Sequence, residues 1–174
     1  MAVLVREARP DEFETLGRIV VAAYRDVGAL AGDEGYVAEL SDVAGRASTA
    51  VVLAAVDAED GRPIGCATYV PGLASPLAEE LGPGEASIRM LAVDPAATGR
   101  GAGSALAAAC VAMARRDGFH RIVLHSLPAM AGAQRIYERL GFRHAPERDW
   151  VPVPEIHLLC FVLDLDAGEV RAAP

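Results

Sequence analysis

The sequence contains no lysine: all sixteen basic residues among its 174 are arginines. With twenty-four acidic residues, the formal net charge is −8 at pH 7, which disfavours a generic nucleic-acid partner. The missing lysine also excludes the GxxxxGK[ST] phosphate-binding loop. The full GxGxxG pattern of dinucleotide-binding proteins and the GxSxG pattern of serine hydrolases are absent as well.

Cysteine and histidine are scarce. Cys66, Cys110 and Cys160 are widely spaced and form no CxxC pair, so we expect reduced core residues. The four histidines form no HxxxH pattern or Cys/His cluster, and no metal is expected. No apolar run approaches the roughly 20 residues of a membrane helix, and the N-terminus lacks the features of a signal peptide. We therefore expect a cytoplasmic protein without a membrane partner.

The length and the 52% hydrophobic content suit a single domain spanning residues 1–174. The charge is unevenly distributed. Residues 1–88 carry six arginines and fifteen acids, residues 89–148 carry nine arginines and four acids, and residues 149–174 carry one arginine and five acids. The central block is therefore basic within an acidic chain. It is read either as solvated surface or as a local anion site.

Hydrophobic periodicity predicts strands and helices in mixed order, which favours an α/β or α+β domain built around one sheet. A hairpin joins two of the strands through a turn that ends in Asp60-Gly61. Residues 71–84 and the stretch from 143 to 154 are expected to be irregular, and the tail from Ala167 frayed. The expected strands are 3–6, 49–56, 63–70, 85–93, 121–126, one beginning at 142, and 156–165; the expected helices are 10–26, 36–44, 99–116 and 130–140.

A glycine-rich turn follows the strand at 85–93 and opens the next helix. Gly99, Gly101 and Gly103 leave room for the backbone to approach a ligand, while the unpaired amides and dipole of the helix start favour an anion such as phosphate. Arg100 is placed to add charge-assisted contacts. Because close packing of a helix on a sheet also demands glycine, the turn alone does not select between these explanations.

Two segments carry a more specific pattern. Residues 98–103 follow the strand end Leu91-Ala-Val-Asp-Pro95 and match [QR]-x-x-G-x-[GA], except that Thr98 replaces Gln or Arg. Residues 133–142 match A-x-x-x-Y-x-x-x-G-F, and Met130 precedes them where Asn is frequent. With these motifs the chain resembles the GNAT superfamily of N-acetyltransferases over essentially its whole length. The resemblance implies a GNAT-like mixed, mostly antiparallel sheet flanked by helices.

The resemblance also implies acetyl-CoA as the cosubstrate, without a metal. The main chain of residues 91–93 is expected to hydrogen-bond the pantetheine arm like an added strand, in a slot where this strand splays from its neighbour. Amides of residues 99–104 are expected to hold the pyrophosphate. The expected cofactor-binding residues are Leu91, Ala92, Val93, Thr98, Gly99, Arg100, Gly101, Ala102, Gly103, Ser104 and Tyr137.

Tyr137 matches the family tyrosine that protonates the leaving thiolate or hydrogen-bonds the sulfur, and a phenol with a pKa of about 10 is protonated at neutral pH. Family members often have an acid near the position of Ser87. Glu85 is the nearest substitute and is expected to act as the base, through water. Strand alternation places Glu85, Ser87, Arg89 and Leu91 on one face in the absence of a bulge, so an Arg89–Glu85 ion pair is the structural alternative.

The implied acceptor is a primary amine on a small molecule, which the acidic flanking segments would attract as a cation. A protein α-amine or lysine is the nearest alternative, and a catalytically weak acyl-CoA-binding sensor is another, favoured by the departures at Thr98 and Met130. The apolar closing strand offers a homodimer interface, although core burial explains it equally well. Solvated surface is the expected position of His125, Glu147, Asp149 and His157.

Overall fold

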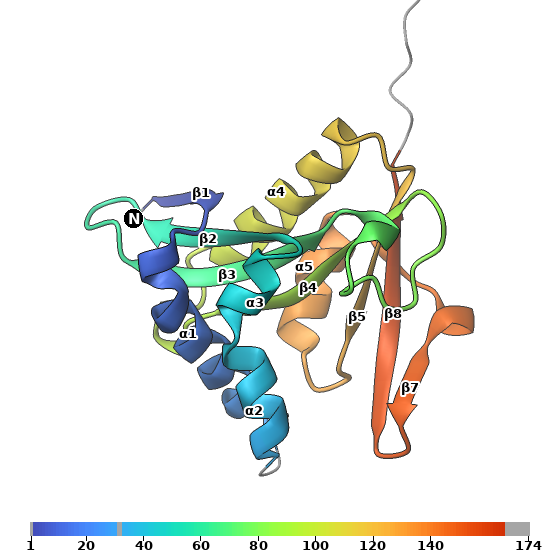
Figure 1. Cartoon of the computed structure of the whole chain (residues 1–174), viewed down its shortest axis with the longest axis horizontal. Coiled ribbons are helices and arrows are strands. Elements are labelled where there is room, and N and C mark those ends of the chain that lie inside the picture. Colours follow the sequence, from blue (N-terminus) through green and yellow to red (C-terminus); the bar gives the residue numbers. More distant parts are fainter. Residues whose placement is uncertain (1, 31–32, 166–174) are drawn as a thin grey trace, which may run out of the picture.

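The computed structural model describes residues 2–30 and 33–165 and has one eight-stranded sheet with helices on both faces (Figure 1). The strand order is β1-β2-β3-β4-β5-β8-β6, and β7 pairs with β8 off this path. Only β4 and β5 pair in parallel, so the expected mixed, mostly antiparallel sheet is confirmed. The strands are β1 (Val3–Glu7), β2 (Val51–Asp57), β3 (Pro63–Val70), β4 (Glu85–Val93), β5 (Arg121–Ser126), β6 (Arg143–His144), β7 (Trp150–Val153) and β8 (Ile156–Asp164).

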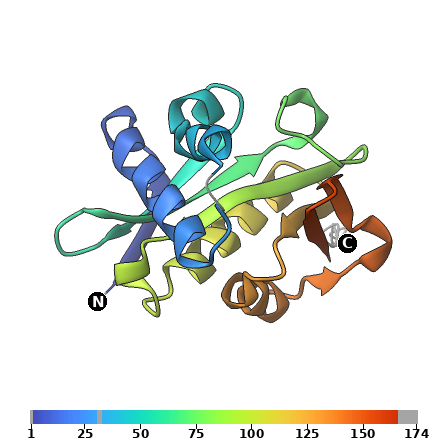
Figure 2. The same ribbon diagram turned by 90° about the horizontal axis from the view of Figure 1, so that it is seen from below.

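The helices form two layers, with α1 to α3 on one face of the sheet and α4 and α5 on the other (Figure 2). Among the helices of the described ranges, none has the length and apolar character needed to cross a bilayer. The α-helices are α1 (Phe13–Asp26), α2 (Glu34–Ser41), α3 (Val43–Ala47), α4 (Ala102–Arg116) and α5 (Ala131–Arg139). Short 3₁₀ turns are η1 (Pro10–Glu12), η2 (Gly72–Ala74), η3 (Pro95–Ala97) and η4 (Pro146–Arg148).

The central strands are apolar on both faces because a helical layer covers each face. In β2, Val52, Ala54 and Val56 pack toward α1 to α3, whereas Leu53 and Ala55 pack toward α4 and α5. This explains why β2 and β3 read as nearly continuous hydrophobic runs in the sequence. All three cysteines are buried and form no disulfide.

A bulge in β4 reverses the facing of its side chains. Cys66 of β3 pairs with Ala92, but Thr68 pairs with Arg89, so β4 contains one extra residue between these pairs. Met90, at this point, has a φ of 49°, in the left-handed region that bulky residues rarely adopt. Leu91 consequently packs toward α4, on the face opposite to Ser87 and Arg89. The alternation expected for a strand without a bulge, which placed Glu85, Ser87, Arg89 and Leu91 on one face, therefore does not extend to Leu91.

Other differences are local. The helix expected over 36–44 is two helices, because the Asp42 side chain accepts a hydrogen bond from the Gly45 amide and starts α3 there. The stretch from 143 to 154 was expected to be irregular, but it contains β7, which pairs with β8. In β8, Cys160, Phe161 and Val162 are buried, so core packing accounts for the apolar closing strand. The tail from Ala167 lies outside the described residues.

Candidate active site

The site begins where β4 and β5 separate. Their parallel pairing extends from Glu85 opposite Arg121 to Ser87 opposite Val123, although β4 continues to Val93. On its other edge, β4 stays paired with β3 as far as Val93. The edge of β4 beyond residue 87 therefore has no strand partner toward β5 within the described residues. Its backbone groups are left for a ligand, as the expected splay requires.

A cleft of about 550 Å³ lies along this open edge. Residues 91–93 form one wall, the glycine-rich turn lies at one end, and α5 and the last turn of α1 close the sides. Most of the residues expected to bind the cofactor line it: Leu91, Ala92, Val93, Thr98, Gly99, Gly101, Ala102, Gly103 and Ser104.

The glycine-rich turn presents the N-terminus of α4 to the cleft. Gly99 and Gly101 have φ values of 80° and 82°, which glycine adopts without steric cost. No side chain in the described structure caps α4, so the amides of its first turn are available to an anion. A Cβ at Gly103 would lie 2.9 Å from Ile136 Cδ1, so this glycine also permits close contact between α4 and α5.

The side chain of Arg100 does not reach the cleft. Its guanidinium forms an ion pair of 2.7 Å with Asp57 at the end of β2, and it is absent from the cleft wall. The expectation that Arg100 adds charge-assisted contacts to an anion at the turn is therefore not supported by its position. The Thr98 hydroxyl itself donates to the Pro95 carbonyl at 3.1 Å and stabilises the turn.

Arg135 and Arg139 are the arginines that line the cleft. They lie four residues apart on α5, so both project from the same side of the helix. Their i, i+4 spacing was visible in the sequence, but only the fold shows which side faces the cleft. Most other arginines of the central basic block instead form ion pairs with acids: Arg89–Glu79, Arg100–Asp57, Arg116–Asp117, Arg121–Glu85, Arg121–Asp164, Arg143–Asp164 and Arg148–Glu85.

Tyr137 lies on α5, whose residues Ala133 and Ile136 line the cleft, but Tyr137 itself is not part of the cleft wall. Only 6% of Tyr137 is exposed, and its ring packs against Phe142 and Phe161 at centroid distances of 5.8 and 6.1 Å. Burial raises the pKa of the phenol, so the hydroxyl is protonated at neutral pH. Tyr137 therefore carries a proton at neutral pH, but, unlike most of the residues expected to bind the cofactor, it does not line the cleft.

A second, smaller cavity of about 90 Å³ adjoins the cleft, which we call the acceptor cavity. It lies along β4 before and at the bulge, whereas the cleft follows the strand after it. Tyr24 and Met130 line both spaces, so the two meet at these side chains. The residues lining the acceptor cavity are Tyr24, Tyr36, Glu79, Ser87, Ile88, Arg89, Met90, His125, Leu127, Met130, Trp150 and Leu158.

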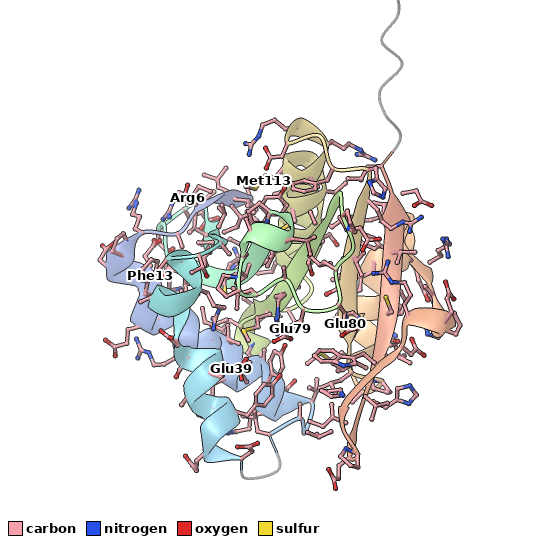
Figure 3. All side chains as sticks on the ribbon, turned by 45° about the vertical axis from the view of Figure 1, so that its right-hand side comes forward. Arg6, Phe13, Glu39, Glu79, Glu80 and Met113 are labelled. Carbon is pink, nitrogen blue, oxygen red and sulfur yellow. The ribbon has the colours of Figure 1, made fainter. Side chains whose placement is uncertain are left out.

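The walls of the acceptor cavity combine aromatic rings with a few charges. Tyr24 and Tyr36 form an edge-to-face pair with centroids 6.0 Å apart. Arg89 binds Glu79 at 3.0 Å and donates to the Leu77 carbonyl at 3.1 Å. Figure 3 shows Glu79, on the loop before β4, between the N-terminal helices and the β7–β8 hairpin. Arg89 thus pairs with Glu79 and not with Glu85.

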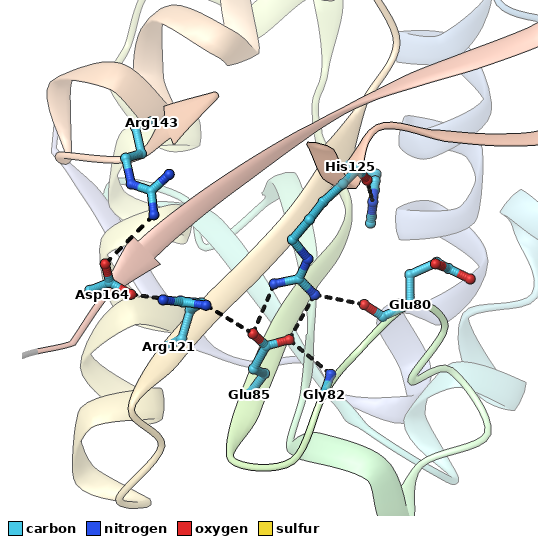
Figure 4. A network of polar contacts seen from close by, with 8 residues as sticks. Glu80, Gly82, Glu85, Arg121, His125, Arg143 and Asp164 are labelled. Carbon is cyan, nitrogen blue, oxygen red and sulfur yellow. Dashed lines mark hydrogen bonds and ion pairs between the residues drawn. The ribbon is translucent and has the colours of Figure 1, made fainter. Parts of the chain in front are cut away.

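Glu85 lies in an ion-pair network outside both spaces (Figure 4). Both of its carboxylate oxygens accept from Arg148 at 2.8 Å, and the Gly82 amide and Arg121 also donate to it. Burial by itself would raise the pKa of Glu85, but the bonds from Arg148 and Gly82 more than offset this and lower it. The position of Glu85 therefore favours a structural role over the predicted base.

His125 lies in the wall of the acceptor cavity, not at the solvated surface. Asp149 is mostly enclosed and accepts from the Cys160 amide at 2.8 Å and from His144, whereas Glu147 and His157 are exposed. Within residues 2–30 and 33–165, no group of three or more His, Cys, Asp or Glu side chains is arranged to hold a metal ion.

Replacing Glu85 with Gln should lower the free energy of unfolding by about 1–3 kcal/mol at pH 7, because Arg148 loses its charged partner. The folded-state pKa of Glu85 lies below its ordinary value of 4.5, so its contribution is present above that value and disappears as the pH falls through the folded pKa. Urea unfolding of both proteins at several pH values should therefore show the difference shrinking in acid.

Asp164→Asn is the matched control, since Asp164 pairs with the same network from an exposed position. Its effect on stability should stay below about 1 kcal/mol. Equal stability of Glu85→Gln and the unmodified protein at pH 7 would contradict the structural role. Loss of one limb of the pH–rate profile in Glu85→Gln would restore Glu85 as the base.

Comparison with known proteins agrees with this architecture. The model of the acetyltransferase (GNAT) family matches residues 13–142. A GNAT-family acetyltransferase from Staphylococcus aureus Mu50 is similar over 94% of this chain and 99% of its own, with a TM-score of 0.74 and 15% identity. The yncA acetyltransferase of Salmonella typhimurium, solved with acetyl-CoA, is similar over 100% and 98%, with a TM-score of 0.68 and 22% identity.

The Escherichia coli ribosomal-protein-S18-alanine N-acetyltransferase is similar over 99% of this chain and 100% of its own, with a TM-score of 0.64 and 15% identity. At these identities the solved structures show a shared fold. Among curated protein sequences, none matches this chain. The family match, which covers most of the chain, goes further: this protein belongs to the GNAT family of acetyltransferases.

Proposed function

We propose that this protein transfers the acetyl group of acetyl-CoA to a primary amine on a small molecule, in a ternary complex. The observation that carries the proposal is the meeting of the large cleft and the acceptor cavity at Tyr24 and Met130. Two substrates bound in these spaces would touch there without an intermediate carrier. Direct attack of the amine on the thioester needs no enzyme nucleophile.

The cleft has the features that coenzyme A requires. The uncapped start of α4 would hold the pyrophosphate through backbone amides, and Arg135 and Arg139 add positive charge along the opposite side. The open edge of residues 91–93 would hydrogen-bond the amides of pantetheine, as an added strand does. Acetyl-CoA supplies the activated acetyl group as a thioester.

Tyr137 is the proton donor in this proposal. Its raised pKa keeps the hydroxyl protonated, and Ala133 and Ile136 of the same helix line the cleft. Donation of a hydrogen bond or a proton to the departing sulfur stabilises negative charge that develops only during the reaction. Its near-complete burial also places it away from bulk water, which strengthens that interaction.

The acceptor cavity favours a small amine. Its volume of about 90 Å³ holds an amino group and a few carbons, and aromatic walls with Glu79 at the rim suit an approaching cation. A protein amine is the alternative acceptor, and the similar Escherichia coli enzyme acts on a ribosomal-protein alanine. A protein substrate would have to insert its terminal residue into this narrow space.

Mixing the protein with acetyl-CoA and a panel of amines, while monitoring thiol release and product mass, tests this proposal. Thiol release with at least one small primary amine, and an acetylated product of matching mass, is the expected result. Tight binding of acetyl-CoA without thiol release across small amines and peptides would instead favour an acyl-CoA-binding sensor. Release with peptides alone would identify a protein acetyltransferase.

Gly101→Ala should weaken acetyl-CoA binding about tenfold, because a Cβ at a φ of 82° strains the turn that presents the α4 amides. Gly118→Ala is the control: Gly118, after α4, has a φ of 81° and the same open surroundings but lies outside the cleft. Both variants should lose about 1 kcal/mol of stability. Calorimetric titration should show weaker binding only for Gly101→Ala, and equal affinities would contradict the amide cradle.

Tyr137→Phe should lower kcat about 100-fold while leaving the Kd of acetyl-CoA nearly unchanged, because the hydroxyl acts mainly on charge that develops in the transition state. Tyr69→Phe is the matched control, since the buried Tyr69 hydroxyl bonds Asp117 at 3.0 Å outside both cavities. The control should lose stability but retain kcat. A Tyr137→Phe protein with the normal rate across pH would refute the acid role.

A further inference from the structure

His125 is held in place at the point where the two central strands part. It lies two residues beyond Val123, the last residue of β5 that pairs with β4. Its backbone remains fixed, because β5 continues to pair with β8 and His125 lies opposite Cys160. Val123, which faces the same side, is fully buried. The imidazole therefore enters the acceptor cavity from a rigid strand.

The hydrogen bond of the ring defines its tautomer. His125 Nε2 lies 3.3 Å from the backbone carbonyl oxygen of Arg148. A carbonyl oxygen can only accept, so Nε2 must carry the proton. In the neutral ring the lone pair then resides on Nδ1, for which the described residues supply no hydrogen-bond partner. The ring of Trp150 packs edge to face against the imidazole at 5.9 Å and fixes its plane.

The surroundings keep the ring neutral. Burial lowers the pKa of His125 from its ordinary value of 6.5, and the nearby charges of Arg148 and Arg89 lower it further. The Arg148 carbonyl and Glu80 act in the opposite direction but do not reverse the shift. Other titratable groups facing the same cavity are Tyr24, Tyr36 and Glu79.

These other groups are poorly suited to accept a proton. Burial raises the pKa of Tyr24 and of Tyr36, so both phenols stay protonated at neutral pH. The carboxylate of Glu79 is bound to Arg89 at 3.0 Å. Glu85, the acid suggested by the sequence, is bound to two arginines outside the cavity. Nδ1 of His125 has no bond to another described residue, whereas Glu79, with its other oxygen unbonded, is held beside the positive charge of Arg89.

We infer that His125 is the general base of the acetyl transfer, taking a proton at Nδ1 from the acceptor nitrogen; this inference rests on the proposed function. The amine lone pair forms the new C–N bond with the thioester carbon, and the C–S bond breaks with its electron pair on sulfur. The proton lost by nitrogen goes to Nδ1 and then to water, while the sulfur takes a proton from Tyr137, which regains one from water, and becomes the thiol.

The Glu85–Arg148 pair becomes a positioning device in this scheme. The guanidinium of Arg148 is clamped by Glu85 and by the Glu80 carbonyl at 2.9 Å, and the backbone carbonyl of the same residue holds His125 (Figure 4). Arg148 therefore contacts both the ion-pair network, through its guanidinium, and the imidazole, through its backbone.

The pH dependence of His125→Gln tests the inference. In the unmodified protein, log(kcat/KM) should fall with a slope of about two below the pKa of His125, because both the base and the amine must be unprotonated. His125→Gln should lose about 100-fold in kcat and fall with a slope of about one over the same range. Added imidazole should partly restore the rate of His125→Ala.

His157→Gln is the matched control, because His157 is exposed on β8, outside the acceptor cavity. This variant should leave both the rate and the pH profile unchanged. A His125→Gln protein with normal kcat and a slope of two would overturn the inference. Glu79→Gln would also overturn the inference if it lost the acid limb of the profile of log(kcat/KM) against pH while His125→Gln kept that limb. In either case acetyl transfer by the unmodified protein would stand.

A second measurement does not depend on finding the acceptor. Nuclear magnetic resonance titration of the unmodified protein should give His125 a pKa below 6.5 and, from its nitrogen shifts, a proton on Nε2 in the neutral ring. The His125→Gln spectrum assigns the signal and shows whether the variant is folded. A pKa at or above 6.5, or a proton on Nδ1, would exclude His125 as the base even if amines are acetylated.

Discussion

The separation of β4 from β5 is the constraint on which the rest of this structure depends. The extra residue at the bulge, with Met90 in a left-handed conformation, reverses the facing of β4 shortly after Ser87, where its pairing toward β5 ends. Such strain persists only where the surrounding structure enforces it, here the continuous pairing with β3. The open edge creates the cleft, and the residues before the bulge face the acceptor cavity. The bulge thus marks the boundary between the acceptor cavity and the cleft, which lie next to each other along β4.

Ion pairs decide what the charged residues can do. The central block of the chain has an excess of arginine, yet most of these arginines are paired with acids from other segments, such as Asp57, Glu79 and Glu85. Arg135 and Arg139 line the cleft and can meet an anion. The charge of the central block therefore suggested more arginines at the cleft than the structure places there. The sequence does not show which acidic partners the fold brings to each arginine.

Local motifs selected residues that the fold brings together in one cleft. The glycines at 99, 101 and 103 line the cleft, since their spacing encodes a turn whose geometry depends on few distant contacts. The acceptor side was predicted poorly. Glu85 was selected by strand alternation and sequence proximity, but three separate segments of the chain bring Arg121, Arg148 and Gly82 to its carboxylate. His125 had no local signal, because its contacts, Trp150 and the Arg148 carbonyl, come from more than twenty residues away.

The sequence by itself determined the fold class, the family and the glycine-rich turn, because hydrophobic periodicity and glycine conformation act over short distances along the chain. Only the tertiary structure decided which charges are neutralised, where β4 opens, and which histidine lines the acceptor cavity. Those properties depend on pairing and burial between segments far apart in sequence. A bulge of one residue changes the facing of every side chain that follows it, and an ion pair changes the chemistry of a carboxylate, without leaving a mark in the local pattern.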